Sequence, residues 1–368
     1  MLASQPSDSV GGSCKRCCKA VGISLKKKIR VITTGGTIGS ILKSDHVAVE
    51  AGASKIAEQI EAVKNKLGFD VEVVSPINKN SEVLSPADWV DVLNSIEDCC
   101  NSDCDGIVVT HGTDTKAYTV AAAVCFSHLW TKKVCFTGAF LAPDHPLSDT
   151  ALSLSSSLEF VAADLPESGV YIAFRSDANN NEAKIFNGFE LKPMGFDEEV
   201  FNPVYGNVVT HYCSVAGLAV DTLADKVDQP TIGDTSLPSK EAVVAAQKKI
   251  AYLHLYPGID KDLLRAVSAG KDIVVLQLYH SGTGPFGAEY SDIIDHIEET
   301  SGDTLFLLGS FPGKHISIPY GSTHALIASG GVLYRDLQTH FLYVFALLAL
   351  SSGKSQTDIR ALLSGWEV

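Results

Sequence analysis

The sequence lacks long apolar runs and has little positive charge. No uninterrupted apolar stretch reaches the roughly 18 residues that cross a bilayer, and the most apolar one, Phe341 to Leu350, is expected to be a buried helix. Lysine and arginine number 29 against 43 acidic residues, which gives a net charge of −14. Proteins that bind nucleic acids usually carry a basic face. We therefore expect neither a nucleic-acid partner nor a membrane-spanning segment.

Cysteine is present but lacks the arrangement of a disulfide framework or a zinc site. The nine cysteines are an odd number scattered through a long chain, which is typical of a reducing compartment and predicts a cytoplasmic protein. Cys14 and Cys17 form one CxxC pair, but no second pair follows at zinc-finger spacing, so we expect no metal. Residues 1–25 contain no apolar secretory segment and are expected to be a flexible leader. Acylation of the leader's cysteines, which would tether it to a membrane, is the alternative.

The first informative stretch is a strand followed by a glycine-rich turn. Ile29 to Thr33 is rich in β-branched residues, and Thr34-Gly35-Gly36-Thr37-Ile38-Gly39 comes directly after it. The glycines allow a sharp turn and bring backbone N–H groups close to any ligand, where they can bind an anion or an oxyanion. Ligands of open α/β sheets bind at the carboxyl ends of strands, so a site is expected here. The alternative is a tight turn in which Thr37 only caps the segment after it.

Residues 105–115 repeat this design. An apolar strand ends in His111-Gly112-Thr113-Asp114-Thr115, which adds a carboxylate to the hydroxyl groups. Two such strand ends can meet across one crevice. The alternative is that Thr113 and Asp114 only cap the helix that begins near Lys116.

Strands and helices alternate along the chain. This alternation predicts a mostly parallel sheet covered on both faces by helices, with an antiparallel hairpin over residues 169–186 at its edge. A segment rich in Asp, Thr, Ser and Pro then predicts a linker before a smaller α/β domain. We predict a leader, an N-terminal catalytic α/β domain, a linker and a C-terminal α/β domain at residues 1–25, 26–222, 223–245 and 246–368.

The two turns resemble the signatures of the bacterial-type L-asparaginase family. The first matches the family's TGGTI signature and the second its HGTDT signature, in the same order and each at a strand end. The likeness is clear from about residue 29 to 203 and fainter in the C-terminal third. It implies the two-domain asparaginase-like α/β fold and an amidohydrolase that needs no cofactor.

The resemblance also implies which side chains act in catalysis. Thr37 takes the position of the nucleophile, and Thr113 and Asp114 take those of the second threonine and the aspartate. Lys192 corresponds to the family lysine, although it lies one residue closer to the hairpin glycine than the family lysine does. Lys184 is the fallback for this position. A lysine of lowered pKa can take the nucleophile's proton through a relay hydroxyl. The alternative for Lys192 is a solvated surface lysine.

The substrate-binding positions implied by the resemblance cluster around the same turns. Ser81 and Glu82 correspond to the segment that holds the substrate carboxylate, and their alternative is a plain loop. Backbone N–H groups near Gly112 or Ala139 would form the oxyanion hole. The full set is Gly36, Ser81, Glu82, Gly112, Thr113, Asp114 and Ala139.

Two positions depart from the family pattern. Residues 40–50 contain no tyrosine, although the lid of many family members carries one about thirteen residues after the nucleophile. Thr283, within Tyr279 to Pro285, replaces the asparagine of the segment that reaches a neighbouring subunit's site. Substrate preference is therefore less defined than the fold.

We expect an L-asparagine amidohydrolase that assembles as a homodimer or a dimer of dimers, with L-glutamine as a further candidate substrate. One alternative is a subunit of a Gln-tRNA amidotransferase. The acidic net charge and the short leader count against it. The other is an amino-acid-binding protein of the same fold with weak or no catalysis.

Overall fold

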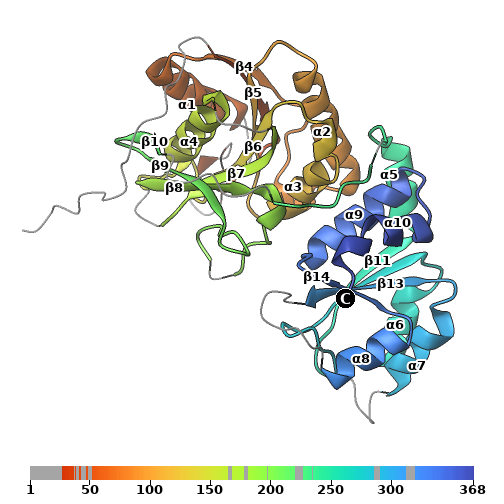
Figure 1. The fold of residues 1–368 in the computed structure, drawn as a ribbon. Coiled ribbons are helices and arrows are strands. Elements are labelled where there is room, and N and C mark those ends of the chain that lie inside the picture. The colour runs from red at the N-terminus through yellow and green to blue at the C-terminus, as the bar shows by residue number, and fades with distance from the viewer. Residues whose placement is uncertain are drawn as a thin grey trace, which may run out of the picture.

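The computed structural model describes residues 27–36, 38, 41–42, 47–48, 52–164, 168–177, 181–196, 198–219, 227–233, 235–285, 291–311 and 320–368. These residues form two α/β domains that lie side by side (Figure 1). The predicted fold class is confirmed. Thr37, Gly39 and most of residues 40–50 lie outside the described residues.

The larger sheet is built from the apolar runs of the N-terminal domain. Its order is β10-β9-β8-β7-β6-β5-β1-β4, parallel from β4 to β7 and antiparallel from β7 to β10. The strands are β1 Lys28–Thr33, β4 Asp70–Val74, β5 Gly106–Thr110, β6 Lys133–Thr137, β7 Gly169–Arg175, β8 Glu182–Asn187, β9 Val208–Cys213 and β10 Gly217–Ala219. The sequence predicted the hairpin of β7 and β8 but not its extension by β9 and β10.

The order of the parallel strands fixes where a ligand site can form. Taken in chain order, the five parallel strands are arranged 2-1-3-4-5, so the direction of winding reverses between β1 and β5. Ligands of open α/β sheets bind at this switch point, outside the carboxyl ends of the two strands. The two glycine-rich turns follow β1 and β5. The topology therefore brings both predicted turns to one crevice.

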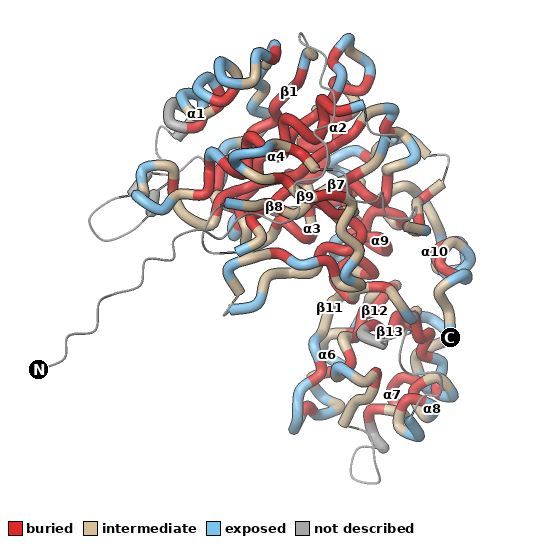
Figure 2. Tube along the Cα trace, turned by 60° about the vertical axis from the view of Figure 1, so that its left-hand side comes forward, coloured by how far each residue is buried: buried red, intermediate tan, exposed pale blue. Residues whose placement is uncertain are grey.

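Helices cover both faces of the larger sheet. Buried side chains of α1 and α4 share one core cluster, and those of α2 and α3 belong to another on the opposite face. The helices are α1 Gly52–Leu67, α2 Pro86–Cys100, α3 Lys116–Cys125 and α4 Thr150–Ala162. Figure 2 shows the buried positions concentrated in the strands between these layers.

The smaller domain carries a parallel sheet in the order β11-β12-β13-β14. Its helix α5 begins at Lys240, so the last residues of the predicted linker are helical. Its elements are α5 Lys240–Gln247, β11 Ile250–His254, α6 Lys261–Ser268, β12 Ile273–Gln277, α7 Ser291–Thr300, β13 Leu305–Phe311, α8 Gly321–Ala328, β14 Val332–Arg335, α9 Thr339–Ser351 and α10 Gln356–Leu362.

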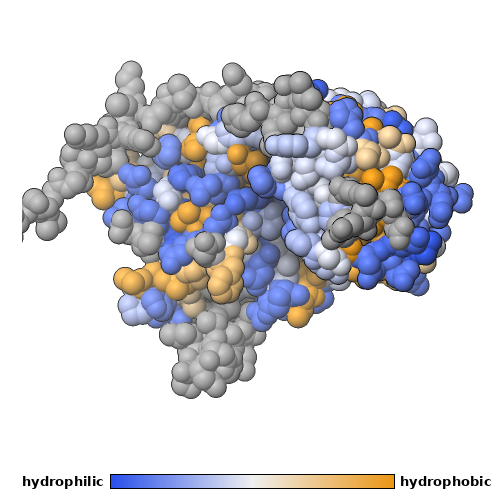
Figure 3. Space-filling model, turned by 90° about the horizontal axis from the view of Figure 1, so that it is seen from below, coloured by the Kyte–Doolittle hydropathy of each residue, from blue (hydrophilic) through white to orange (hydrophobic). Residues whose placement is uncertain are grey.

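The apolar helix α9 joins the two domains. Its buried face belongs to the same core cluster as α2 and α3, and the rings of Phe189 and Phe341 meet edge to face with centroids 5.1 Å apart. This confirms that Phe341 to Leu350 is a buried helix. No helix in the described part of the chain is both long and apolar enough to span a bilayer. On the face seen in Figure 3, hydrophilic and hydrophobic residues are interspersed.

The segment after the first glycine-rich turn contains regular structure. Residues 40–49 show no sustained periodicity, yet Ile41–Leu42 and Val47–Ala48 pair as the short antiparallel strands β2 and β3. Two-residue strands are too short to produce an alternating pattern, which is why the sequence did not indicate them.

Candidate active site at the carboxyl edge of the larger sheet

The turns after β1 and β5 are in direct backbone contact. A methyl group built on Gly36 would lie 2.5 Å from both the Cα and the N of Gly112, so only glycine fits. Gly36 also has φ +80°, a left-handed conformation that other residues adopt at a cost. The Thr34 hydroxyl and N–H both donate to the Thr110 carbonyl, at 2.9 and 3.3 Å. The predicted convergence of the two turns at one edge is therefore present.

Ser81 completes this edge from a third loop. It lies in a short 3-10 helix, Ser81–Val83, and is 3% exposed. A methyl group on Gly112 would lie 2.7 Å from Ser81 Cβ, and the Thr115 hydroxyl donates to the Ser81 carbonyl at 2.8 Å. We call the group Gly36, Ser81 and Gly112 the strand-end site.

An ion pair holds the Ser81 loop in place. The Lys79 N–H donates to the Thr34 carbonyl at 3.0 Å, and its ammonium donates to Asp88 at 2.6 Å. Asp88 also accepts bonds from the N–H and the hydroxyl of Ser85 in the capping box of α2. Burial acts to raise the pKa of the Asp88 carboxyl, but the bonds from Lys79 and Ser85 outweigh it and hold the pKa below its usual value.

Replacing Asp88 by asparagine is expected to lower the free energy of unfolding by about 1 kcal/mol at neutral pH, because Lys79 is half-exposed and screened. Since the carboxyl pKa is lowered in the folded state, its contribution is present at neutral pH and is lost as the pH falls below 3.8 and through the folded value. Urea unfolding of Asp88→Asn and wild type from neutral to acidic pH measures this. A difference that stays constant down to acidic pH would contradict the assignment.

His111 fixes the backbone of the second turn. It is fully buried, and burial lowers its pKa to about 4, so the ring is neutral at physiological pH. Its Nδ1 lies 2.8 Å from the Gly112 carbonyl, which can only accept, so Nδ1 carries the hydrogen. Its Nε2 then accepts from the Thr119 hydroxyl at 2.8 Å. The neutral ring therefore acts as a brace between the turn and α3.

The loop after β6 borders the same edge. A methyl group on Gly138 would clash with the His111 carbonyl oxygen, and Ala139 is buried beside it. The following N–H groups, of Phe140 and Leu141, donate to the buried Asp149 carboxylate at 3.0 Å. Asp149 thus sets the course of the loop that contains Ala139.

The structure places the remaining predicted residues around this edge. Thr113 is half-buried, and Asp114 and Glu82 are exposed. The N-cap of α3 is Thr115, with no side-chain cap hydrogen bond. Neither Thr113 nor Asp114 is therefore the N-cap residue of α3.

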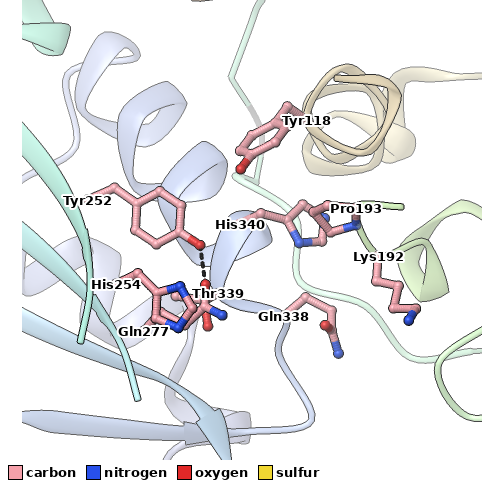
Figure 4. Close-up of a pocket in the computed structure, with 9 residues that line it drawn as sticks. All are labelled: Tyr118, Lys192, Pro193, Tyr252, His254, Gln277, Gln338, Thr339 and His340. Atoms are coloured by element: carbon pink, nitrogen blue, oxygen red, sulfur yellow. Dashed lines mark hydrogen bonds between the residues drawn. The ribbon is translucent and has the colours of Figure 1, made fainter. Parts of the chain in front are cut away.

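The structure places Lys192 in a different setting. Its ammonium is partly exposed and donates to Glu198 at 2.6 Å. It lines a cavity of about 530 Å³ between the domains, and Figure 4 shows it at the opposite end from Tyr252 and His254. The remaining lining residues are Tyr118, Pro193, Gln277, Gln338, Thr339 and His340. Lys184, the fallback, donates to Asn202 at 2.8 Å.

Sequence reasoning missed three buried polar residues of this region, namely Lys116, Asp149 and His111 as a brace. A signal for Lys116 existed, since it is the one charged residue in the apolar helix that runs to Cys125. Asp149 shows no such signal, because its role depends on N–H groups of a loop eight and nine residues earlier.

The Thr283 segment forms a closed turn after β12. The Tyr279 N–H donates to the Thr283 carbonyl at 2.7 Å, and the Gly282 N–H donates back to Tyr279 at 2.8 Å. The Thr323 hydroxyl of α8 holds the Gly282 carbonyl at 2.8 Å. The turn is therefore braced within the C-terminal domain.

Comparison with known proteins agrees with this geometry. Residues 28–194, which contain both glycine-rich turns and the Ser81 loop, match the family described as "Asparaginase, N-terminal". The N-terminal domain belongs to the asparaginase family. Within the described residues, no group of three or more His, Cys, Asp or Glu side chains is arranged to hold a metal ion.

Curated relatives of this chain include amidotransferase subunits. It is 26% identical over 340 residues to the D subunit of the glutamyl-tRNA(Gln) amidotransferase of Thermoplasma acidophilum, covering 88% of this chain and 75% of the relative. The corresponding protein of Saccharolobus islandicus is 26% identical over 344 residues, covering 92% and 74%.

Solved structures with the same fold are asparaginases by title. The thermostable L-asparaginase from Thermococcus kodakarensis has a TM-score of 0.68 at 22% identity, covering 91% of this chain and 96% of that one. A probable cytoplasmic L-asparaginase from Campylobacter jejuni has a TM-score of 0.71 at 19% identity, covering 92% and 99%. These likenesses show the two-domain fold.

Proposed function

We propose that this chain is an amidohydrolase that converts L-asparagine and water to L-aspartate and ammonia through an acyl-enzyme. The observation that carries the proposal is the contact of Gly36 with Gly112 at the switch point, with Ser81 packed against them. Three loops then present hydroxyl and N–H groups to one small ligand. The asparaginase-family match of the same residues supports this chemistry.

The reaction uses Thr37 as the nucleophile. Its hydroxyl loses a proton to a relay of Thr113 and a lysine, and the oxygen bonds to the amide carbon of the substrate. The C–N bond then breaks, ammonia leaves with the relayed proton, and water hydrolyses the resulting ester. Lys192, the lysine that the resemblance implies, donates to Glu198 in the structure. Asp114 would position the accepting amine and bind the substrate's α-ammonium.

Backbone donors stabilise the charge that develops. The N–H groups near Gly112 and Thr113, or of Ala139, would bind the oxyanion, and each such donor is typically worth about 3 kcal/mol. Ser81 and neighbouring N–H groups would hold the α-carboxylate. Glu82 is exposed beside Ser81, and its presence there makes L-glutamine a substrate to test.

The proposal predicts ammonia release by the purified chain alone. Incubation with L-asparagine should give equimolar L-aspartate and ammonia, and L-glutamine under the same conditions measures the side-chain preference. Absence of ammonia from both amides would overturn the proposal. Calorimetric binding of L-aspartate without turnover would then support the amino-acid-binding alternative.

A second candidate is an amidotransferase subunit that supplies ammonia to a tRNA-bound glutamyl group. The observation that favours it is that the curated relatives at 26% identity carry that name. Ammonia release that requires glutamyl-tRNA and further subunits would support it. Turnover of free L-asparagine by the isolated chain would exclude it as the main role.

We also propose a cytoplasmic homodimer or dimer of dimers. The six cysteines in the described part of the chain are free thiols, which suits a reducing compartment. A similar solved structure is called cytoplasmic in its title. Light scattering measures the assembly, and a monomer with full activity would contradict a site completed by a neighbouring subunit.

A further inference from the structure

Among the described residues, Lys116 is a buried amine that has no hydrogen-bond partner, and it lies in the helix that follows the second turn of the strand-end site. It is the first residue of α3, directly after Thr113-Asp114-Thr115, and it is 0% exposed. Its Nζ has no hydrogen-bond partner within the described residues. Burying a charged ammonium without such bonds lowers the free energy of unfolding. An amine in this position is therefore expected to be neutral or to have a catalytic role.

The surroundings of Lys116 come from the loop after β6, from the carboxyl end of strand β7 and from the segment between β8 and β9. A methyl group on Gly138 would lie 2.6 Å from Nζ, so glycine there leaves room for the amine. The rings of Phe174 and Phe201 lie 4.6 and 4.9 Å from Nζ by their centroids. The amine is therefore enclosed beside the loop that leads to Ala139.

Burial dominates the protonation of this amine. It lowers the pKa of Lys116 to about 7, against an opposing effect of the nearby Asp149 carboxylate and a smaller one of Cys135. Asp149 is already bonded to two N–H groups, burial keeps Cys135 a neutral thiol by raising its pKa, and His111 is neutral. A large share of Lys116 is therefore uncharged at physiological pH.

The other candidate lysines differ in this respect. Lys192 and Lys184 each donate to an oxygen, and both ammonium groups reach solvent. Lys133 also has a lowered pKa of about 8, but it lies at the amino end of β6 and donates to the Phe160 and Ala163 carbonyls. The carboxyl ends of the strands, where the site lies, are at the opposite edge.

We propose that Lys116, rather than Lys192 or Lys184, is the amine that accepts the nucleophile's proton at the strand-end site, acting through Thr113. This rests on the proposed amidohydrolase function. The Thr113 hydroxyl does not bond Nζ in the present structure, so the step requires it to come within hydrogen-bond distance of Nζ when substrate binds. The lone pair of neutral Nζ then forms an N–H bond as the Thr113 O–H bond breaks, and Thr113 takes the proton of Thr37. The same proton returns to the substrate nitrogen as the C–N bond breaks, so no other reactant is needed.

The test compares Lys116→Met with Lys192→Met and Lys184→Met across pH, using L-asparagine. Lys116→Met is expected to lower kcat by about 10²-fold or more with KM changed less than about threefold. Wild-type kcat should rise with pH through about 7, because only the neutral amine accepts a proton, and this rise should be absent from Lys116→Met. Lys192→Met and Lys184→Met should keep kcat within about threefold and keep the rise.

Lys116→Arg separates proton acceptance from positive charge. Arginine stays protonated, so this variant should be as slow as Lys116→Met. Recovery of kcat by arginine would overturn the proposal, as would a wild-type pH profile in Lys116→Met. Loss of activity in Lys192→Met alone would return the role to Lys192.

A stability measurement checks the buried amine without reference to activity. The pKa of Lys116 is lower in the folded state than in the unfolded state. The free-energy cost of burying its charge is therefore fully present below pH about 7 and disappears as the pH rises toward 10.5. Lys116→Met should therefore melt at a higher temperature than wild type, by a larger margin near pH 6 than near pH 10. This margin with an unchanged kcat would overturn the proton role and leave the proposed function standing. An inactive wild type would instead refute the proposed function.

Discussion

Replacing Thr113 by valine is expected to lower kcat for ammonia release from L-asparagine by about 10³-fold, with the fold intact. Valine keeps the shape of threonine but has no hydroxyl, so no proton can pass from Thr37 to the amine. Thr113 is half-buried and does not cap α3, so the loss would not come from a missing helix cap. Steady-state kinetics and circular dichroism measure the two quantities.

Thr235→Val is the matched control, because Thr235 is also half-buried but lies in the segment before α5. Thr37→Ala is expected to be at least as slow as Thr113→Val. The double variant should have the same kcat as the slower single variant. Each substitution alone already blocks the same proton transfer, so the second adds no further loss. Normal turnover by either single variant would remove that residue from the mechanism.

Replacing Gly36 by alanine is expected to cost about 3 kcal/mol of unfolding free energy or more and to abolish activity. The new methyl group would lie 2.5 Å from the Gly112 backbone, so one of the two turns must move. The positive φ of +80° adds strain of about 1 kcal/mol. Urea unfolding and kcat/KM measure both effects.

Gly206→Ala isolates the effect of the contact. Gly206 has nearly the same φ, +78°, but a methyl group there meets nothing within 4 Å. Its cost should therefore be the strain alone, about 1 kcal/mol, with kcat/KM unchanged. Equal effects of the two substitutions would show that the turns are not packed as described.

The elements that sequence predicted are those with strong local patterns. The strands β1, which is rich in β-branched residues, and β5, which is an apolar run, are each followed by a glycine-rich turn, and α9 is an almost uninterrupted apolar helix. The pair β9 and β10 was missed because its strands are short or mix polar and half-buried residues, and they are stabilised by pairing with β8. Local periodicity does not contain that information.

The candidate site could be predicted in outline because its parts lie in two short motifs and follow strands. The contact between Gly36 and Gly112 required the strand order, which places β1 beside β5. Lys116 was missed, although it is the one charged residue of an apolar helix, because lysines are usually exposed. Its burial depends on Phe174, Phe201 and Gly138, which arrive from distant parts of the chain.

A crystal structure of Thr113→Val with L-asparagine bound tests the central claim most directly. The account predicts one amino acid at the edge formed by the β1 and β5 turns, with its α-carboxylate on Ser81 and its amide carbon facing the Thr37 hydroxyl. An amino acid bound only in the cavity beside Lys192 and His340, with the turns empty, would contradict the account.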